Sequence, residues 1–144
     1  MSEFLDVQTQ LKNEIIQLGK DKKFSTFDGA LPTGEMLKKE NGRYWPYVVF
    51  GLGGKSEVAN RQKGIVSSAE DNKWSSLVFF CVGDTPDTIR KLKDVLRTKY
   101  EGYVPALGWG QFTEILTGDF GISKPDPDLI PLRFGETISF KVMV

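Results

Sequence analysis

Hydrophobic residues near the N-terminus recur at intervals of three and four, which is the spacing of one face of a helix. The stripe consists of Phe4, Val7, Leu11, Ile15 and Leu18. It predicts an amphipathic helix of about four turns, and Gly19 is the expected end of that helix.

Glycine and proline punctuate residues 21–44, so this region is predicted to be mostly loop. A brief strand is expected at residues 23–27 and a helical turn at residues 36–39. Residues 44–52 are rich in aromatic and β-branched side chains and predict a strand, with Pro46 near its start, where a missing amide donor is tolerated.

A second strand is predicted at residues 72–83, after a long polar loop that occupies residues 53–71. Its apolar stretch at residues 77–82 is continuous, which is typical of a strand inside a sheet that is covered on both faces. Cys81 lies within this stretch and is interpreted as a small buried hydrophobic residue, not as a reactive thiol.

Residues 86–100 carry the clearest helix signals of the chain. Asp84 or Thr85 is the expected N-cap, Pro86 lies in the first turn, and Gly102 follows the last turn. The predicted buried stripe consists of Ile89, Leu92, Val95, Leu96 and Tyr100.

Two more strands are predicted at residues 111–116 and 137–144. The second alternates apolar side chains with Ser139, Lys141 and Met143, as a strand with one buried face does. The order of elements predicts an α+β fold, in which an N-terminal helix and the helix at 86–100 pack on a mostly antiparallel sheet. No internal boundary divides residues 1–144, so we expect a single domain.

Composition excludes several classes of function. The 144 residues contain 19 basic and 19 acidic side chains, so no overall charge attracts nucleic acid or anionic lipid, and no apolar run is long enough to span a membrane. Histidine is absent, which removes the common catalytic triads and zinc sites. Asp126 and Asp128 are interpreted as an exposed turn. We therefore expect no enzyme, no metal and no cofactor.

Two features of the sequence resemble binding motifs, and each has a simpler interpretation. The sequence from Gly51 to Ser56 contains Gly-Lys-Ser, but the phosphate-binding loop needs a glycine at position 49, where this chain has valine. A glycine-rich hairpin loop is favoured, and nucleotide binding is kept as the alternative of another class. Trp45, Trp74 and Trp109 are not interleaved with basic residues, so we interpret them as core or subunit-interface residues rather than as a surface for single-stranded nucleic acid.

The segment that runs from the tryptophan strand into the helix resembles tail terminator proteins of long-tailed, siphovirus-type bacteriophages, in particular those of actinobacterial phages. In that pattern, a strand with a tryptophan ends in Cys-Val-Gly and leads through a short Thr-Pro turn into a helix. The residues from Pro46 to Phe50 match the earlier strand of the pattern. The other matching residues are Trp74, Cys81, Val82, Gly83, Thr85, Pro86, Asp94, Val95 and Arg97. The resemblance covers residues 44–102 well and the N-terminal helix loosely.

The resemblance implies a structural virion protein at the head-proximal end of the tail. Such a protein forms a ring, expected to be hexameric, that caps the tail tube, ends its polymerisation and joins the tail to the neck. The implied partners are other copies of the chain, the tail tube protein and a head or neck connector protein. A role as another neck, head-to-tail connector or tail-completion protein is the alternative.

The loop at residues 53–67 carries three basic residues, Lys55, Arg61 and Lys63, against one acidic residue. In a ring this charge would repeat in every copy, so the loop is a candidate to face the lumen, where it would contact passing DNA, or an acidic rim of the tube. An ordinary solvated loop is the alternative.

Overall fold

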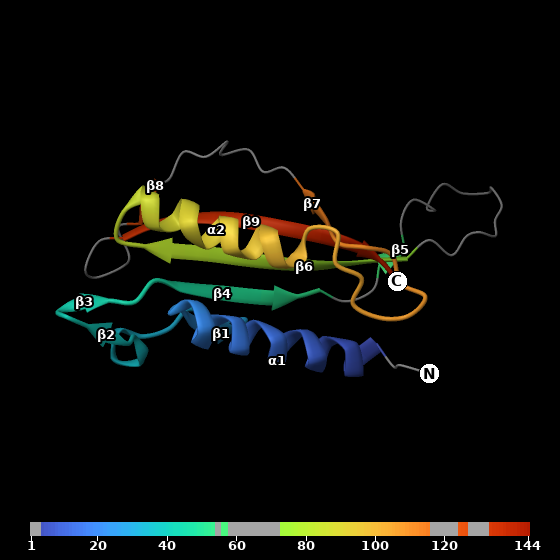
Figure 1. Ribbon diagram of the computed structural model, residues 1–144, viewed down its shortest axis with the longest axis horizontal. Helices are drawn as coiled ribbons and strands as arrows, with labels where there is room; N and C mark the ends of the chain where they lie inside the picture. The colour runs from blue at the N-terminus through green and yellow to red at the C-terminus, as the bar shows by residue number, and fades with distance from the viewer. Residues whose placement is uncertain (1–3, 54–55, 58–72, 116–123, 127–132) are drawn as a thin grey trace.

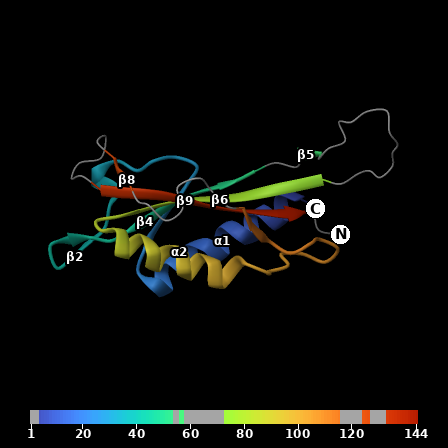
Figure 2. The ribbon, with the colours of Figure 1, turned by 90° about the horizontal axis from the view of Figure 1, so that it is seen from above.

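The computed structural model describes residues 4–53, 56–57, 73–115, 124–126 and 133–144. Two helices, α1 (Phe4–Lys22) and α2 (Pro86–Tyr100), lie on the same side of one sheet (Figures 1 and 2). The predicted α+β fold with an N-terminal helix and a mostly antiparallel sheet is confirmed.

The main path of the sheet has the order β1-β4-β6-β9-β7. The short strand β5 pairs with β6, and β8 pairs with β9. A separate hairpin is formed by β2 and β3, and a turn of 3-10 helix, η1 (Gly34–Met36), precedes it. The strands are β1 (Ser25–Asp28), β2 (Lys39–Glu40), β3 (Arg43–Tyr44), β4 (Tyr47–Leu52), β5 (Ser56–Glu57), β6 (Lys73–Gly83), β7 (Thr113–Ile115), β8 (Lys124–Asp126) and β9 (Arg133–Met143).

The long strand β6 lies between β4 and β9 and is antiparallel to both, as its apolar sequence predicts. The pairing of β1 is different, because β1 runs parallel to β4 at the edge of the sheet. A parallel pair needs a crossover connection, and residues 29–46 provide it. The sheet is therefore mixed at this one edge and antiparallel along the rest of its main path.

The N-terminus of α2 follows the predicted pattern and decides between the two expected caps. Thr85 is the N-cap: its backbone is extended and its side-chain oxygen accepts a hydrogen bond from the Thr88 amide. Pro86 is the first helical residue, and Gly102 follows the helix with a φ of 82°.

Beneath the helix, Lys93 Nζ donates to the buried Glu136 carboxylate of β9 at 2.9 Å.

The predicted end of α1 at Gly19 is wrong, because the helix continues to Lys22. The chain then reverses at Lys23, whose φ is 62°, and the Phe24 amide donates to the Gly19 carbonyl at 3.0 Å, which is the bonding pattern of a Schellman C-cap. A Cβ on Gly19 would lie 2.6 Å from the Phe24 carbonyl oxygen. Glycine is needed here so that the chain leaving the helix can pack against it.

The core lies between the helices and the facing side of the sheet. The apolar side chains of β4, β6 and β9 that point to the helices are buried together with the stripes of α1 and α2. In β9 the predicted alternation is confirmed, since Ile138, Phe140 and Val142 are buried while Lys141 and Met143 are exposed. Cys81 is fully buried in this core, where burial raises the pKa of its thiol to about 12.

The opposite side of the sheet, which we call the open face, is covered by neither α1 nor α2 (Figure 2). Side chains alternate between the two faces of a strand. Val78 and Phe80 of β6, Val49 of β4 and Phe27 of β1 point to the open face and are half-buried, whereas Tyr47 and Val82 point to the same face near the hairpin and are fully buried. Ile115 of β7 is 40% exposed. Both helices pack on one face of β6, while on its other face Val82 is fully buried and Val78 and Phe80 are half-buried, so the predicted cover on both faces is only partly met.

Candidate functional site

The hairpin of β2 and β3 has a sequence cause that the loop prediction for residues 21–44 missed. Lys39 pairs with Tyr44 and Glu40 pairs with Arg43, which leaves a two-residue turn of Asn41 and Gly42. Their φ values are 54° and 77°, as a type I′ turn requires, and Asn-Gly is a preferred sequence for that turn. The Asn-Gly pair is thus the signal that could have found this element.

The hairpin is stabilised by internal polar contacts and is joined to the end of β6 by an ion pair. The indole Nε1 of Trp45 donates to Glu40 at 3.0 Å, and the Lys38 ammonium lies 4.0 Å from the centroid of the Trp45 ring. Arg43 reaches the start of α2, where its Nε and Nη2 both donate to Oδ2 of Asp84. These contacts fix the residues on either side of a pocket.

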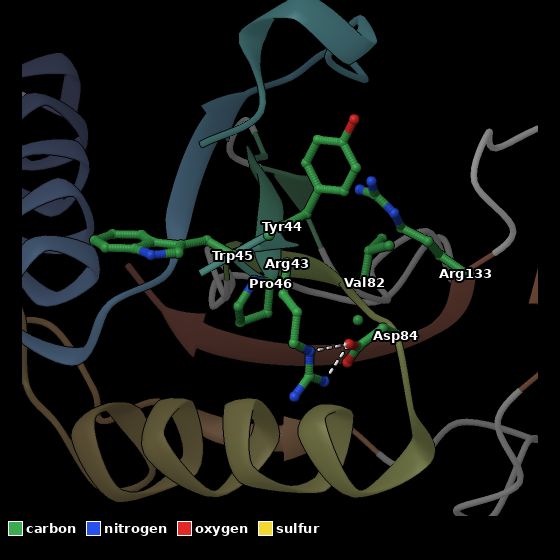
Figure 3. A pocket seen from close by; sticks show the side chains of 9 residues that line it. Arg43, Tyr44, Trp45, Pro46, Val82, Asp84 and Arg133 are labelled. Atoms are coloured by element: carbon green, nitrogen blue, oxygen red, sulfur yellow. Dashed lines mark hydrogen bonds and ion pairs between the residues drawn. The ribbon is translucent and has the colours of Figure 1, made fainter. Parts of the chain in front are cut away.

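The pocket lies where the hairpin, the end of β6 and the start of β9 meet (Figure 3). Its volume is about 260 Å³. Figure 3 shows Arg43 extending to Asp84, whereas Tyr44 and Arg133 lie side by side on the other side of β3. The lining residues are Gly42, Arg43, Tyr44, Trp45, Pro46, Val82, Gly83, Asp84 and Arg133.

The two arginines of the pocket differ in their partners. Hydrogen bonding from Arg43 holds the pKa of Asp84 below its usual value, and the same contact raises the pKa of Arg43. This ion pair is exposed, so its charges are also screened by solvent. Because Arg43 and Asp84 neutralise each other, Arg133 supplies the excess positive charge among the described lining residues.

Arg133 is buried, with only 4% of its surface exposed. Its guanidinium carbon lies 4.3 Å from the centroid of the Tyr44 ring and 5.9 Å from that of Tyr47. These are cation–π contacts with the faces of the two rings. The Nη2 atom is buried and has no hydrogen-bond partner, which is uncommon for a charged donor away from water.

No protein family model matches this chain, and no curated protein matches it either. Within the described residues, no group of three or more metal-ligating side chains is placed together. The described helices include none that is long and apolar enough to cross a bilayer.

Several residues of the Trp-to-helix pattern lie at the edge of this pocket or next to it. Gly83 and Asp84 line the pocket, and Thr85 and Pro86 follow directly as the N-cap and first residue of α2. A Cβ on Gly83 would lie 2.9 Å from the methyl group of Thr88, so glycine lets the first turn of α2 pack against the end of β6. Trp74 lies at the opposite end of β6 from Gly83, and the Lys141 ammonium is 4.8 Å from the centroid of its ring.

The basic residues Lys55, Arg61 and Lys63 lie outside the described residues, so their predicted orientation stays a prediction. Gly51 belongs to β4 and pairs with Val78, and the Gly53 amide donates to the Ser76 carbonyl at 2.8 Å.

Of the carboxylates considered at the end of the chain, Asp126 ends β8, and Asp128 lies outside the described residues. The pocket residue Arg133 was not predicted from the sequence, because a single arginine at the start of a strand carries no pattern of its own.

Proposed function

We propose that this protein is the tail terminator of a long-tailed bacteriophage. It forms a ring, hexameric by resemblance, that caps the tail tube, stops its polymerisation and joins the tail to the head or neck connector. The resemblance of residues 44–102 motivates this proposal. The fold agrees with it, because β6 leads through the Thr85 N-cap into α2 in the order that the pattern requires.

The observation that carries the proposal is the one-sided packing of the sheet. Both helices bury one face, while the open face presents the half-buried side chains of Phe27, Val49, Val78 and Phe80. Apolar side chains on a face without a covering helix are suited to contacts with another protein surface. A ring uses one patch of each copy against a different patch of the next copy, and the open face supplies one such patch.

In such a ring, the basic residues between β4 and β6 are the candidates to face the lumen or the tube rim, as the sequence predicts, with an ordinary solvated loop as the alternative. At the lumen, Lys55, Arg61 and Lys63 would form a circle of positive charge, because every copy contributes three. Such a circle would attract an acidic tube rim or contact DNA that passes through. The protein acts as a structural part of the virion and performs no catalysis.

The proposal is tested by assembling tails with a variant whose open face is altered. Val78→Lys places a charge at the centre of that face, and Lys91→Glu on the exposed surface of α2 is the control. Circular dichroism and urea unfolding first establish that both variants fold. We expect Val78→Lys to lose ring formation and tail-length control, while Lys91→Glu keeps both.

Two results would redirect or overturn the proposal. Gold-labelled protein found at the vertex of tailless heads would instead assign it to the neck or connector. Normal rings and normal tail lengths with folded Val78→Lys would remove the open face from the assembly and with it the main structural support for the proposal.

A further inference from the structure

The buried guanidinium of Arg133 is the strongest unexplained feature of the described residues. A buried charged donor without a hydrogen-bond partner destabilises a fold, and the Nη2 atom of Arg133 is such a donor. The neighbouring tyrosine ring contacts the guanidinium plane, but a ring face cannot accept in the plane of the N–H groups as an oxygen can. An external acceptor would complete the coordination of this side chain.

The pocket in front of Arg133 is suited to a small acceptor. Its volume of about 260 Å³ is below the range of roughly 300–1,000 Å³ that is usual for whole small-molecule ligands. It therefore offers room for one small functional group such as a carboxylate. The walls are formed by Tyr44, Pro46 and Val82 as well as by the two arginines (Figure 3), so an acceptor there would be partly shielded from water.

We infer that this pocket binds one carboxylate group, which Arg133 holds through its guanidinium N–H groups. The planar fork of an arginine matches the two oxygens of a carboxylate. The single excess positive charge of the pocket matches its single negative charge. A phosphate dianion fits less well, because the single excess positive charge of the pocket leaves its second negative charge unbalanced. This inference does not depend on the proposed function.

The carboxylate has two possible sources, namely a free small molecule or an acidic side chain or chain terminus of a neighbouring protein. Both present the same two oxygens to Arg133. The test therefore uses acetate as the probe for the pocket itself and protein dilution as the probe for a neighbouring copy.

Nuclear magnetic resonance of ¹⁵N-labelled protein follows the side-chain signals of Arg133 and the backbone amides of Tyr44 and Gly83. Acetate is added at constant ionic strength, and chloride and inorganic phosphate are compared with it. We expect saturable shifts with acetate at a half-saturation on the order of 10 mM, because so small a ligand cannot bind tightly. Chloride should cause no saturable change, and phosphate should bind more weakly than acetate.

Two variants show whether the response belongs to Arg133. Arg133→Met keeps the length of the side chain without its charge and should weaken the acetate response at Tyr44 and Gly83 at least tenfold. Arg133→Lys keeps the charge without the fork and should give an intermediate effect. Arg90→Met, on the exposed surface of α2, should respond to acetate as the unmodified protein does.

If a neighbouring copy supplies the carboxylate, the Arg133 signals change on dilution, acetate competes with that change, and Arg133→Met removes it. The inference is overturned if neither acetate nor dilution affects Arg133. It is also overturned if chloride acts as acetate does, if phosphate binds tenfold more tightly than acetate, or if folded Arg133→Met responds normally.

Discussion

Replacing Arg133 with methionine should stabilise the protein when no carboxylate is present. The guanidinium is buried and its Nη2 lacks a hydrogen-bond partner, a situation that costs about 3 kcal/mol for a charged donor. Its stacking on the Tyr44 ring at 4.3 Å returns about 2 kcal/mol. Methionine fills much of the same space and removes both the unpartnered donor and the cation–π contact. The free energy of unfolding should therefore rise by about 1 kcal/mol.

Urea unfolding followed by circular dichroism in a buffer free of carboxylates measures this difference. For a chain of this size a gain of 1 kcal/mol also raises the melting temperature by roughly 3 °C. The exposed variant Arg90→Met serves as the control, and its stability should change by less than about 0.5 kcal/mol.

Adding 100 mM acetate should reverse the order of stability. With a dissociation constant on the order of 10 mM, acetate should stabilise the unmodified protein by about 1.4 kcal/mol and leave Arg133→Met unaffected. Loss of 1 kcal/mol or more in Arg133→Met without acetate would refute the reasoning, because it would show that Arg133 stabilises the fold by itself.

Three further predictions concern the fold. Gly19→Ala should lower the free energy of unfolding by about 1–3 kcal/mol despite the better helix propensity of alanine, because its Cβ meets the returning chain. A Cβ on residue 51 meets no other atom, so Gly51→Ala should be neutral or slightly stabilising in the same urea titration. Hydrogen bonding from Arg97 lowers the pKa of Glu114 in the folded state. The stability that this pair contributes should therefore be complete above about pH 4.3, the pKa of Glu in the unfolded chain, and should fall as the pH drops further. Glu114→Gln should flatten that part of a pH titration of stability, and an unchanged profile would contradict the assignment. Cys81 should not react with a thiol reagent at pH 8 until the protein unfolds, because its thiol is buried and its pKa is raised to about 12; rapid labelling of folded protein would contradict this.

The sequence predicted the elements whose signals are local. The Thr85 cap, Pro86 and Gly102 surround a stripe with helical spacing, so α2 appears where it was expected. The alternation in β9 likewise reports directly which side chains face the core. In both cases, residues within one segment determine the structure of that segment.

The rest depends on contacts between distant segments. Gly19 looked like a helix end, but it is buried inside α1 because Phe24 packs against it. The apolar run of β6 predicted burial on both faces, but it could not show that both helices lie on the same side of the sheet.

The pocket was not predictable for the same reason. Arg133 meets Tyr44 only after β9 and the hairpin have been placed at the same end of the sheet. No spacing along the chain connects two residues so far apart.

The central proposal, that this protein ends the growth of a phage tail tube, is tested most directly by the length of assembled tails. Tail tube protein and its assembly partners are combined with and without this chain, and the tubes are measured by electron microscopy. The proposal predicts tubes of one defined length with a ring at the head-proximal end when the chain is present, and overlong tubes when it is absent. Identical length distributions, with no ring on the tubes, would contradict it.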